Sequence, residues 1–323
     1  MKRLMFWEVV VLSVLLIATV IVLLTFPNPK ISLSAPEEPG SPTQQNPLAD
    51  LFIPSWNTYP DDRQLLAQQY FVYDCKENTF LITSGQENTK VYPASITKLF
   101  TAYVAMQHLQ PTDQITAGDA LDYVVAGSSV AKIKRGDVLT VEQLVEAMLL
   151  PSGNDAAYVL ACAAGRAIKA DPNLGAGAAV RAFMEEMNAQ AAAVGMTGTK
   201  FQNPDGIHDP GHYSTFADLA ILGKLALGNA TILKYAATAR DKITLHGETM
   251  EWKNTNKLVD PRHSYYCPYA LGLKTGQTPD AGSCLLSAFR YEEHELIIGV
   301  FSCPEEEDRF DDTLQLFNQI VLK

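Results

Sequence analysis

The sequence has few cysteines and no excess of positive charge, and both shortages narrow what the protein can be. Its five cysteines are spread over 323 residues with an odd total and no dense spacing, unlike a disulfide framework or the paired ligands of a zinc site. We predict that they pack in the core, although Cys284 and Cys303 fall in consecutive strand-like segments and could be neighbours. Lys and Arg number 25 against 36 Asp and Glu, a net charge of −11, so we expect no nucleic-acid partner.

Signatures of several enzyme classes are also missing. There is no Gly-x-Ser-x-Gly elbow for a Ser-His-Asp hydrolase, and the Gly- and Ala-rich stretch 174–180 has no phosphate-loop lysine. His208 and His212 stand four residues apart, but Pro210 and Gly211 disfavour the helix that would bring both onto a metal. The sequence therefore predicts neither a metal site nor a cofactor.

A long apolar run is present at the N-terminus. Lys2 and Arg3 precede eighteen uncharged residues, Val9 to Phe26, which as a helix would span about 27 Å, close to the thickness of a bilayer core. We interpret residues 1–26 as an uncleaved transmembrane anchor, with a cleaved signal peptide as the alternative. The basic residues before the span place the rest of the chain outside the cytoplasm.

A proline-rich linker and one domain follow the anchor. Residues 27–60 contain eight prolines among Ser, Gln, Asn and Glu, which predicts a stalk without helix or strand. No internal repeat occurs, so residues 61–323 form one predicted catalytic domain. Its hydrophobic periodicity indicates strands at 70–74, 80–84, 271–275, 283–289 and 296–302, and helices at 95–104, 141–149, 155 onward, 178–194, 215–227 and 309–322. This order predicts an α+β fold, in which an antiparallel sheet flanked by helices adjoins an all-helical subdomain.

Ser95 and Lys98 form a Ser-x-x-Lys pair at the start of a predicted helix. Unbonded N–H groups and the helix dipole favour developing negative charge there, and Lys98 lies one turn on, on the same face. The pair can act as nucleophile and base if the pKa of Lys98 falls, and we expect burial and the charge of Lys274 to lower it. Alone, the same pair also fits a solvated helix start with an exposed lysine.

Two later triplets carry polar groups at turns or strand ends. Ser152-Gly-Asn154 joins two predicted helices, so Ser152 can relay a proton and Asn154 can bind a substrate amide. Lys274-Thr-Gly276 lies on a predicted strand, where Lys274 can hold a carboxylate and Gly276 lets a substrate approach closely. Each triplet alone is better explained as an ordinary loop or strand end, and only their order after Ser95 favours acyl-serine chemistry.

Taken together, the motifs resemble those of the serine D-alanyl-D-alanine carboxypeptidases, the low-molecular-mass penicillin-binding proteins of peptidase family S11. The resemblance covers nearly all of residues 68–303. It rests on Tyr92-Pro-Ala-Ser-Ile-Thr-Lys98, Gly136-Asp-Val-Leu-Thr140, Leu150-Pro-Ser-Gly-Asn-Asp-Ala156, Met187-Asn-Ala-Gln-Ala191, Phe201-Gln-Asn-Pro-Asp-Gly206, Asn254-Thr-Asn256 and Gly272-Leu-Lys-Thr-Gly-Gln-Thr278.

The resemblance implies a β-lactamase/transpeptidase-like fold and a cell-wall substrate. Ser95 would attack between the two terminal D-alanines of a peptidoglycan stem peptide, with Lys98 as base and Ser152 assisting proton transfer. Asn154, Lys274, Thr275 and Gly276 would bind substrate, and the N–H groups of Ser95 and Gln277 would form the oxyanion hole. β-Lactams would acylate the same serine as covalent inhibitors, at a domain held outside the bacterial membrane.

The sequence departs from the family pattern at a few places. Many members continue into a β-rich domain and a C-terminal anchor, whereas this sequence stops at Lys323, and we expect the N-terminal span to replace that anchor. Thr255 stands where some members have an arginine, so a further cation such as Arg262 is a candidate for the carboxylate; Leu271 replaces an acidic residue often found there.

Two other functions remain as alternatives. A class A-like β-lactamase would need a glutamate on a loop, whereas Glu185 and Glu186 fall in a predicted helix. A non-catalytic module that binds peptidoglycan or penicillin would have no use for an activated Ser95.

Overall fold

The computed structural model describes residues 64–321, so the predicted anchor at 1–26 and the stalk at 27–60 lie outside the described residues. Within residues 64–321, no single helix is both long and apolar enough to cross a membrane. Helices α6 (Phe216–Leu227) and α7 (Ala230–Ala237) meet the length and composition criteria only as a pair, which is bent by 95°.

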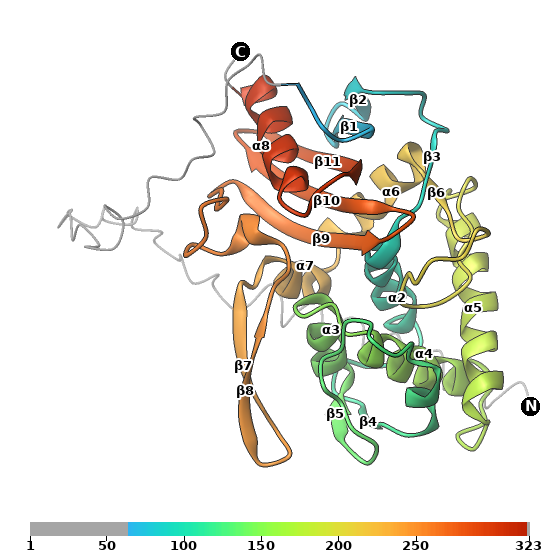
Figure 1. Ribbon diagram of the computed structural model, residues 1–323. Helices are drawn as coiled ribbons and strands as arrows, with labels where there is room; N and C mark the ends of the chain where they lie inside the picture. Colours follow the sequence, from blue (N-terminus) through green and yellow to red (C-terminus); the bar gives the residue numbers. More distant parts are fainter. Residues whose placement is uncertain (1–63, 322–323) are drawn as a thin grey trace, which may run out of the picture. The chain divides into compact units, whose positions relative to one another are not determined.

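A five-stranded antiparallel sheet forms the centre of the fold, in the order β2-β1-β11-β10-β9 (Figure 1). The meander predicted from the last strands is confirmed, and the first strand inserts beside the last one. The strands are β1 (Gln69–Asp74), β2 (Thr79–Thr83), β9 (Ala270–Thr278), β10 (Gly282–Tyr291) and β11 (His294–Cys303). Strand β9 is an edge of this sheet, and that edge borders the site described below.

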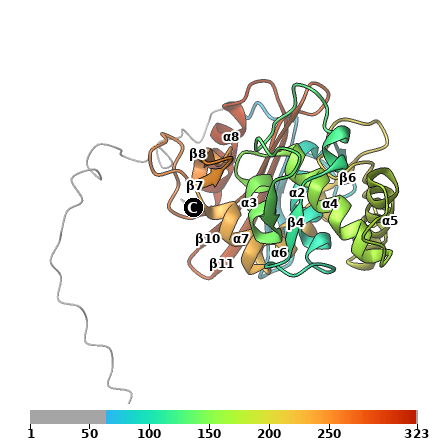
Figure 2. The same cartoon turned by 90° about the horizontal axis from the view of Figure 1, so that it is seen from below.

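Helices cover both faces of the sheet, which explains the nearly continuous apolar runs in β10 and β11. Because side chains alternate along a strand, Leu285 and Phe289 pack with helix α8 (Asp308–Val321), as predicted for the closing helix. Leu286 and Ala288 point the other way, into the core shared with α6 and the remaining helices. Both views show α8 on the face of the sheet away from the helical part (Figures 1 and 2).

The helical part contains α2 (Thr97–Ala105), α3 (Val141–Leu149), α4 (Asn154–Ile168) and α5 (Ala176–Ala193), with α4 between α3 and α5 (Figure 2). The Thr140–Gln143 capping box predicted for α3 is present. The subdomain is not all-helical, because strands β4 (Gln114–Thr116) and β5 (Val138–Thr140) pair within it.

A hairpin of β7 (Arg240–Leu245) and β8 (Glu248–Lys253) was not predicted. Its two-residue turn, His246-Gly247, has φ values of 58° and 76°, as a type I′ turn requires. The remaining described elements are short: strands β3 (Lys90–Val91) and β6 (Ser214–Thr215), which pair with each other, and 3-10 helices η3 (Ala94–Ile96), η4 (Asp119–Tyr123) and η5 (Lys257–Val259).

The cysteines pack as single residues, as predicted. All five carry free thiols; Cys162, Cys267, Cys284 and Cys303 are buried, and Cys75 is partly buried.

Candidate active site

Ser95 and Lys98 lie within hydrogen-bond distance at the start of the first long helix. Ser95 occupies the 3-10 turn η3, and Lys98 follows in the first turn of α2, rather than both lying in one α-helix. The ammonium Nζ of Lys98 donates to Ser95 Oγ at 2.7 Å and to the main-chain oxygen of Asp205 at 2.6 Å. The geometry required of a nucleophile and its base is therefore present.

The Asp205 carbonyl is held in place by a tight loop. Gly206 has φ of 84°, and a side chain there would collide with the Ala94 carbonyl, so only glycine lets the loop press against η3. One residue before Asp205, the Pro204 carbonyl accepts a hydrogen bond from Thr101 of α2 at 2.7 Å. The loop thus carries an acceptor for Lys98 that the sequence motif did not reveal, because the acceptor is a backbone atom.

Burial of Lys98 makes its neutral form accessible. Its side chain has no solvent exposure, and burial lowers its pKa to about 8 while the carboxylates of Asp205 and Asp155 act in the opposite direction. We expected the charge of Lys274 to contribute, but burial is the cause for Lys98. Neighbouring cations matter instead for Lys274. Burial first, and then the charges of Lys98 and Arg309, hold the pKa of Lys274 well below its usual value.

The Ser152-Gly-Asn154 connector faces the same space from the helical side. Ser152 has φ of 62°, an unusual backbone conformation for a residue other than glycine. Asn154 opens α4, and its Oδ1 is buried without a hydrogen-bond partner among the described residues. A buried amide oxygen left open in this way can accept from a substrate N–H.

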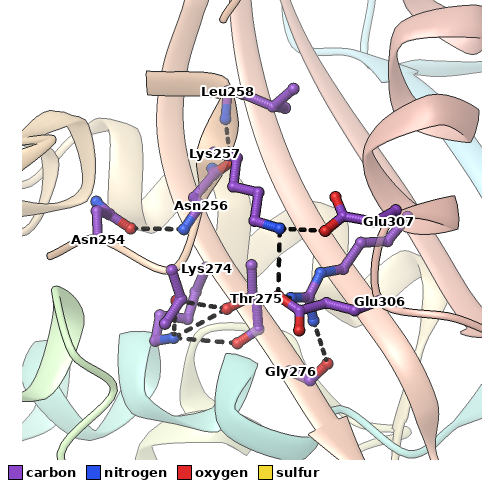
Figure 3. Close-up of polar contacts among 11 residues, drawn as sticks. Asn254, Asn256, Lys257, Leu258, Lys274, Thr275, Gly276, Glu306 and Glu307 are labelled. Atoms are coloured by element: carbon purple, nitrogen blue, oxygen red, sulfur yellow. Dashed lines mark hydrogen bonds and ion pairs between the residues drawn. The ribbon is translucent and has the colours of Figure 1, made fainter. Parts of the chain in front are cut away.

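Strand β9 passes close to Ser95 and carries the third motif. A side-chain carbon at Gly276 would lie 2.7 Å from Pro93 O and 3.2 Å from Ser95 N, so the strand can approach this closely only with glycine. Lys274 is fully buried and donates to Thr255 Oγ1 at 3.2 Å, Thr275 O at 3.1 Å and Thr275 Oγ1 at 3.4 Å (Figure 3). Strict alternation along β9 would point Thr275 away from Lys274. Instead, the Thr275 hydroxyl lies 2.6 Å from that of Thr255, and Lys274 contacts both.

The three motifs border one cavity of about 390 Å³. Six predicted site residues line it: Ser95, Ser152, Asn154, Thr275, Gly276 and Gln277. The two lysines lie behind this lining because their side chains are fully buried. The sequence hypothesis that a hydroxyl and two ammonium groups converge on one cleft is consistent with this geometry.

The residues that sequence reasoning missed are Thr255 and Arg309. Arg309, in the first turn of α8, is 3% exposed and lines the cavity; it donates to Gly276 O at 3.3 Å, and its Nε has no partner among the described residues. Arg262, our earlier candidate, is not among the lining residues. The sequence did contain one signal for Arg309: it lies in the first turn of a predicted helix, where the helix dipole disfavours a cation, so a functional role was worth considering.

Two rival sites considered from the sequence, a metal site and a β-lactamase-type glutamate at 185 or 186, can be compared with the structure. Within residues 64–321, no group of three His, Cys, Asp or Glu is arranged to hold a metal ion. His212 instead bonds Thr97 Oγ1 at 2.8 Å, and burial lowers its pKa to about 4. Glu185 and Glu186 lie in α5, as predicted, and pair with Lys169 and His108 rather than lining the cavity.

Comparison with protein families gives one clear match. The D-alanyl-D-alanine carboxypeptidase family of peptidases matches residues 57–304. The chain is 36% identical over 220 residues to a D-alanyl-D-alanine carboxypeptidase of Streptomyces sp. strain K15, a match that covers 65% of this chain and 72% of the relative. It is 28% identical over 235 residues to the D-alanyl-D-alanine carboxypeptidase DacF of Bacillus subtilis, covering 71% of this chain and 56% of DacF. The match thus spans little more than half of that longer relative.

Among solved structures, the Streptomyces K15 DD-transpeptidase superimposes with a TM-score of 0.70 at 32% identity, covering 79% of this chain and 97% of that one. This similarity confirms the predicted α+β, transpeptidase-like fold.

Proposed function

This chain belongs to the D-alanyl-D-alanine carboxypeptidase family of serine peptidases, and we propose that it removes the terminal D-alanine from peptidoglycan stem peptides. Ser95 Oγ attacks the carbonyl carbon between the last two D-alanines, the C–N bond breaks, and D-alanine leaves. The resulting acyl-enzyme is hydrolysed by water. The observation that carries this proposal is the 2.7 Å contact between Ser95 Oγ and a fully buried Lys98 whose pKa burial lowers to about 8.

Proton transfer follows from the same contacts. In its neutral form Lys98 takes the proton of Ser95 as the new C–O bond forms, and the Asp205 carbonyl at 2.6 Å holds the amine in place throughout. Ser152, which also lines the cavity, relays a proton to the departing amine. Asn154 accepts from the substrate amide through its unpartnered Oδ1.

The substrate lies along the free edge of β9. Because β9 is an edge strand beside Ser95, an extended peptide can pair with it, and Gly276 leaves room for the peptide backbone. The N–H groups of Ser95 and Gln277 form the oxyanion hole in this arrangement.

The terminal carboxylate is held by hydroxyl groups with cations behind them. Lys274 donates to the hydroxyl oxygens of Thr275 and Thr255, and these two hydroxyls share a hydrogen bond, which leaves one hydroxyl hydrogen to turn toward an anion in the cavity. Arg309 adds a guanidinium at the cavity wall. We therefore assign Lys274 an indirect role, in place of the direct contact expected from its motif.

The proposal also covers where the protein acts and which compounds inhibit it. Residues 1–26 anchor the chain, and the domain acts on peptidoglycan outside the cytoplasm; the support for the anchor is the sequence alone. β-Lactams acylate Ser95 because their carboxylate and strained amide occupy the same positions as the substrate.

An amine can replace water in resolving the acyl-enzyme. The solved Streptomyces relative is named a DD-transpeptidase, whereas its sequence is named a carboxypeptidase. The two outcomes share every step up to the acyl-enzyme and differ only in the acceptor, so the ratio of hydrolysis to transfer is measured by adding a D-amino acid or glycine.

A direct test compares wild type with Ser95→Ala. Purified protein is incubated with a peptide ending in D-Ala-D-Ala and with penicillin, and D-alanine release and covalent mass gain are followed. Wild type should show both, and Ser95→Ala should show neither, while Ser84→Ala at the far edge of the sheet behaves as wild type. Rapid turnover of penicillin would identify a β-lactamase instead. Tight binding without D-alanine release would identify a non-catalytic module.

A further inference from the structure

One wall of the cavity carries a negative charge beside its cation. Glu306 lines the cavity, and its Oε1 accepts from Arg309 Nη2 at 2.9 Å. The Glu306 carboxyl is half-exposed, at 49%, whereas the guanidinium that it contacts is buried. Glu306 is therefore the partner with room to turn away, whereas Arg309 is enclosed by the protein.

Arg309 is held by other contacts as well. Its Nη1 donates to Gly276 O at 3.3 Å, and its guanidinium carbon lies 5.0 Å from the centre of the Phe310 ring. Lys257 contacts Glu306 at 3.7 Å and forms a second ion pair with Glu307 (Figure 3). If Glu306 moves away, Arg309 keeps its place through the Gly276 carbonyl, and Lys257 remains available to receive the freed carboxylate.

We propose that Glu306 is the resident anion of the carboxylate subsite, and that the substrate carboxylate displaces it from Arg309. This inference rests on the proposed function. In the free protein, Glu306 compensates the charge of Arg309, whose burial makes an unpaired state costly. On binding, the substrate carboxylate replaces Glu306 as the acceptor of the hydrogen bond from Arg309 Nη2, and Glu306 turns toward Lys257 and solvent. Glu306 thus competes with every anionic substrate or inhibitor, and it tunes affinity without touching the reacting atoms.

The test is Glu306→Gln in the full-length protein, which keeps the shape of the side chain and removes its charge. KM for D-alanine release should fall about twofold to fivefold with kcat nearly unchanged, which is the size expected for a half-exposed ion pair. The second-order rate of acylation by penicillin, which also carries a carboxylate, should rise by a similar factor. Glu307→Gln is the matched control, because Glu307 contacts Lys257 and not Arg309.

A rise in KM, or no change, would overturn the inference: the first would show that Glu306 holds Arg309 in a productive position, the second that it is not displaced. Added salt distinguishes an effect of charge from an effect of packing. Without Glu306 the charge of Arg309 is uncompensated, so kcat/KM of Glu306→Gln should fall more steeply with ionic strength than that of wild type. Failure of the proposed function is distinguishable, because wild type itself would then release no D-alanine.

Discussion

The protonation state of Lys98 makes the sharpest prediction. If neutral Lys98 is the base, acylation of Ser95 should follow the fraction of neutral amine. With a pKa of about 8, that fraction is about 1% at pH 6, about 50% at pH 8 and about 91% at pH 9. The second-order acylation rate should therefore rise about fiftyfold from pH 6 to pH 8 and about twofold more above it.

Stopped-flow acylation by a fluorescent penicillin between pH 6 and pH 9.5 measures this profile. An ordinary exposed lysine, with its pKa near 10.5, would give a tenfold rise per unit over the whole range, without a bend near pH 8. Lys98→Arg is the matched variant, since a guanidinium keeps the charge and does not deprotonate. It should lose about 10²- to 10⁴-fold in rate at pH 9, where wild-type Lys98 is mostly neutral, and show no bend near pH 8. Folding is checked at each pH by circular dichroism.

A rate that stays flat from pH 6 to pH 9, in protein that remains folded, would refute the assignment of Lys98 as the base. A bend at pH 8 that persists in Lys98→Arg would do so as well, because another group would then be titrating.

Three further changes test other parts of the site. Gly276→Ala places a carbon 2.7 Å from Pro93 O and should cost about 10²-fold in kcat/KM, while Gly228→Ala, with no contact closer than 3.4 Å, should cost little; equal losses would contradict the close approach of β9. Thr255→Val removes the hydroxyl that Lys274 contacts and should raise KM about tenfold in steady-state assays, with less effect on kcat. In the folded protein the pKa of His212 is about 4, whereas in the unfolded chain it is about 6.5. As the pH falls below 6.5 the unfolded state therefore binds a proton that the folded state does not, and stability is lost. Urea unfolding should therefore show stability falling by about 2 kcal/mol from pH 7 to pH 4.5, a loss reduced in His212→Asn.

Much of the site was predictable because its chemistry is local. Ser95 and Lys98 are one helical turn apart, so their contact follows from spacing alone. The helix start at Thr140 was likewise visible from its capping box, and the start near Asp155 was visible from an alanine-rich run. The fold class followed from the order of apolar runs.

The rest depended on contacts between distant segments. The insertion of β1 between β2 and β11 joins the two ends of the domain, and no local pattern specifies a partner more than 200 residues away. Arg309 and Thr255 meet β9 only after the sheet and α8 are in place. The Asp205 acceptor is a backbone atom, which residue identity does not reveal. The β7–β8 hairpin was missed because its turn is His-Gly rather than the commoner Asn-Gly.

The place of α8 has a consequence for biosynthesis. This helix is the last element described, and its first turn supplies both the buried guanidinium and the anion beside it. A nascent chain that has not reached residue 306 already contains Ser95 and Lys98, yet it lacks the cation and the anion of this cavity wall. Of the residues that line the cavity, this cation and its anion are therefore the last to be synthesised.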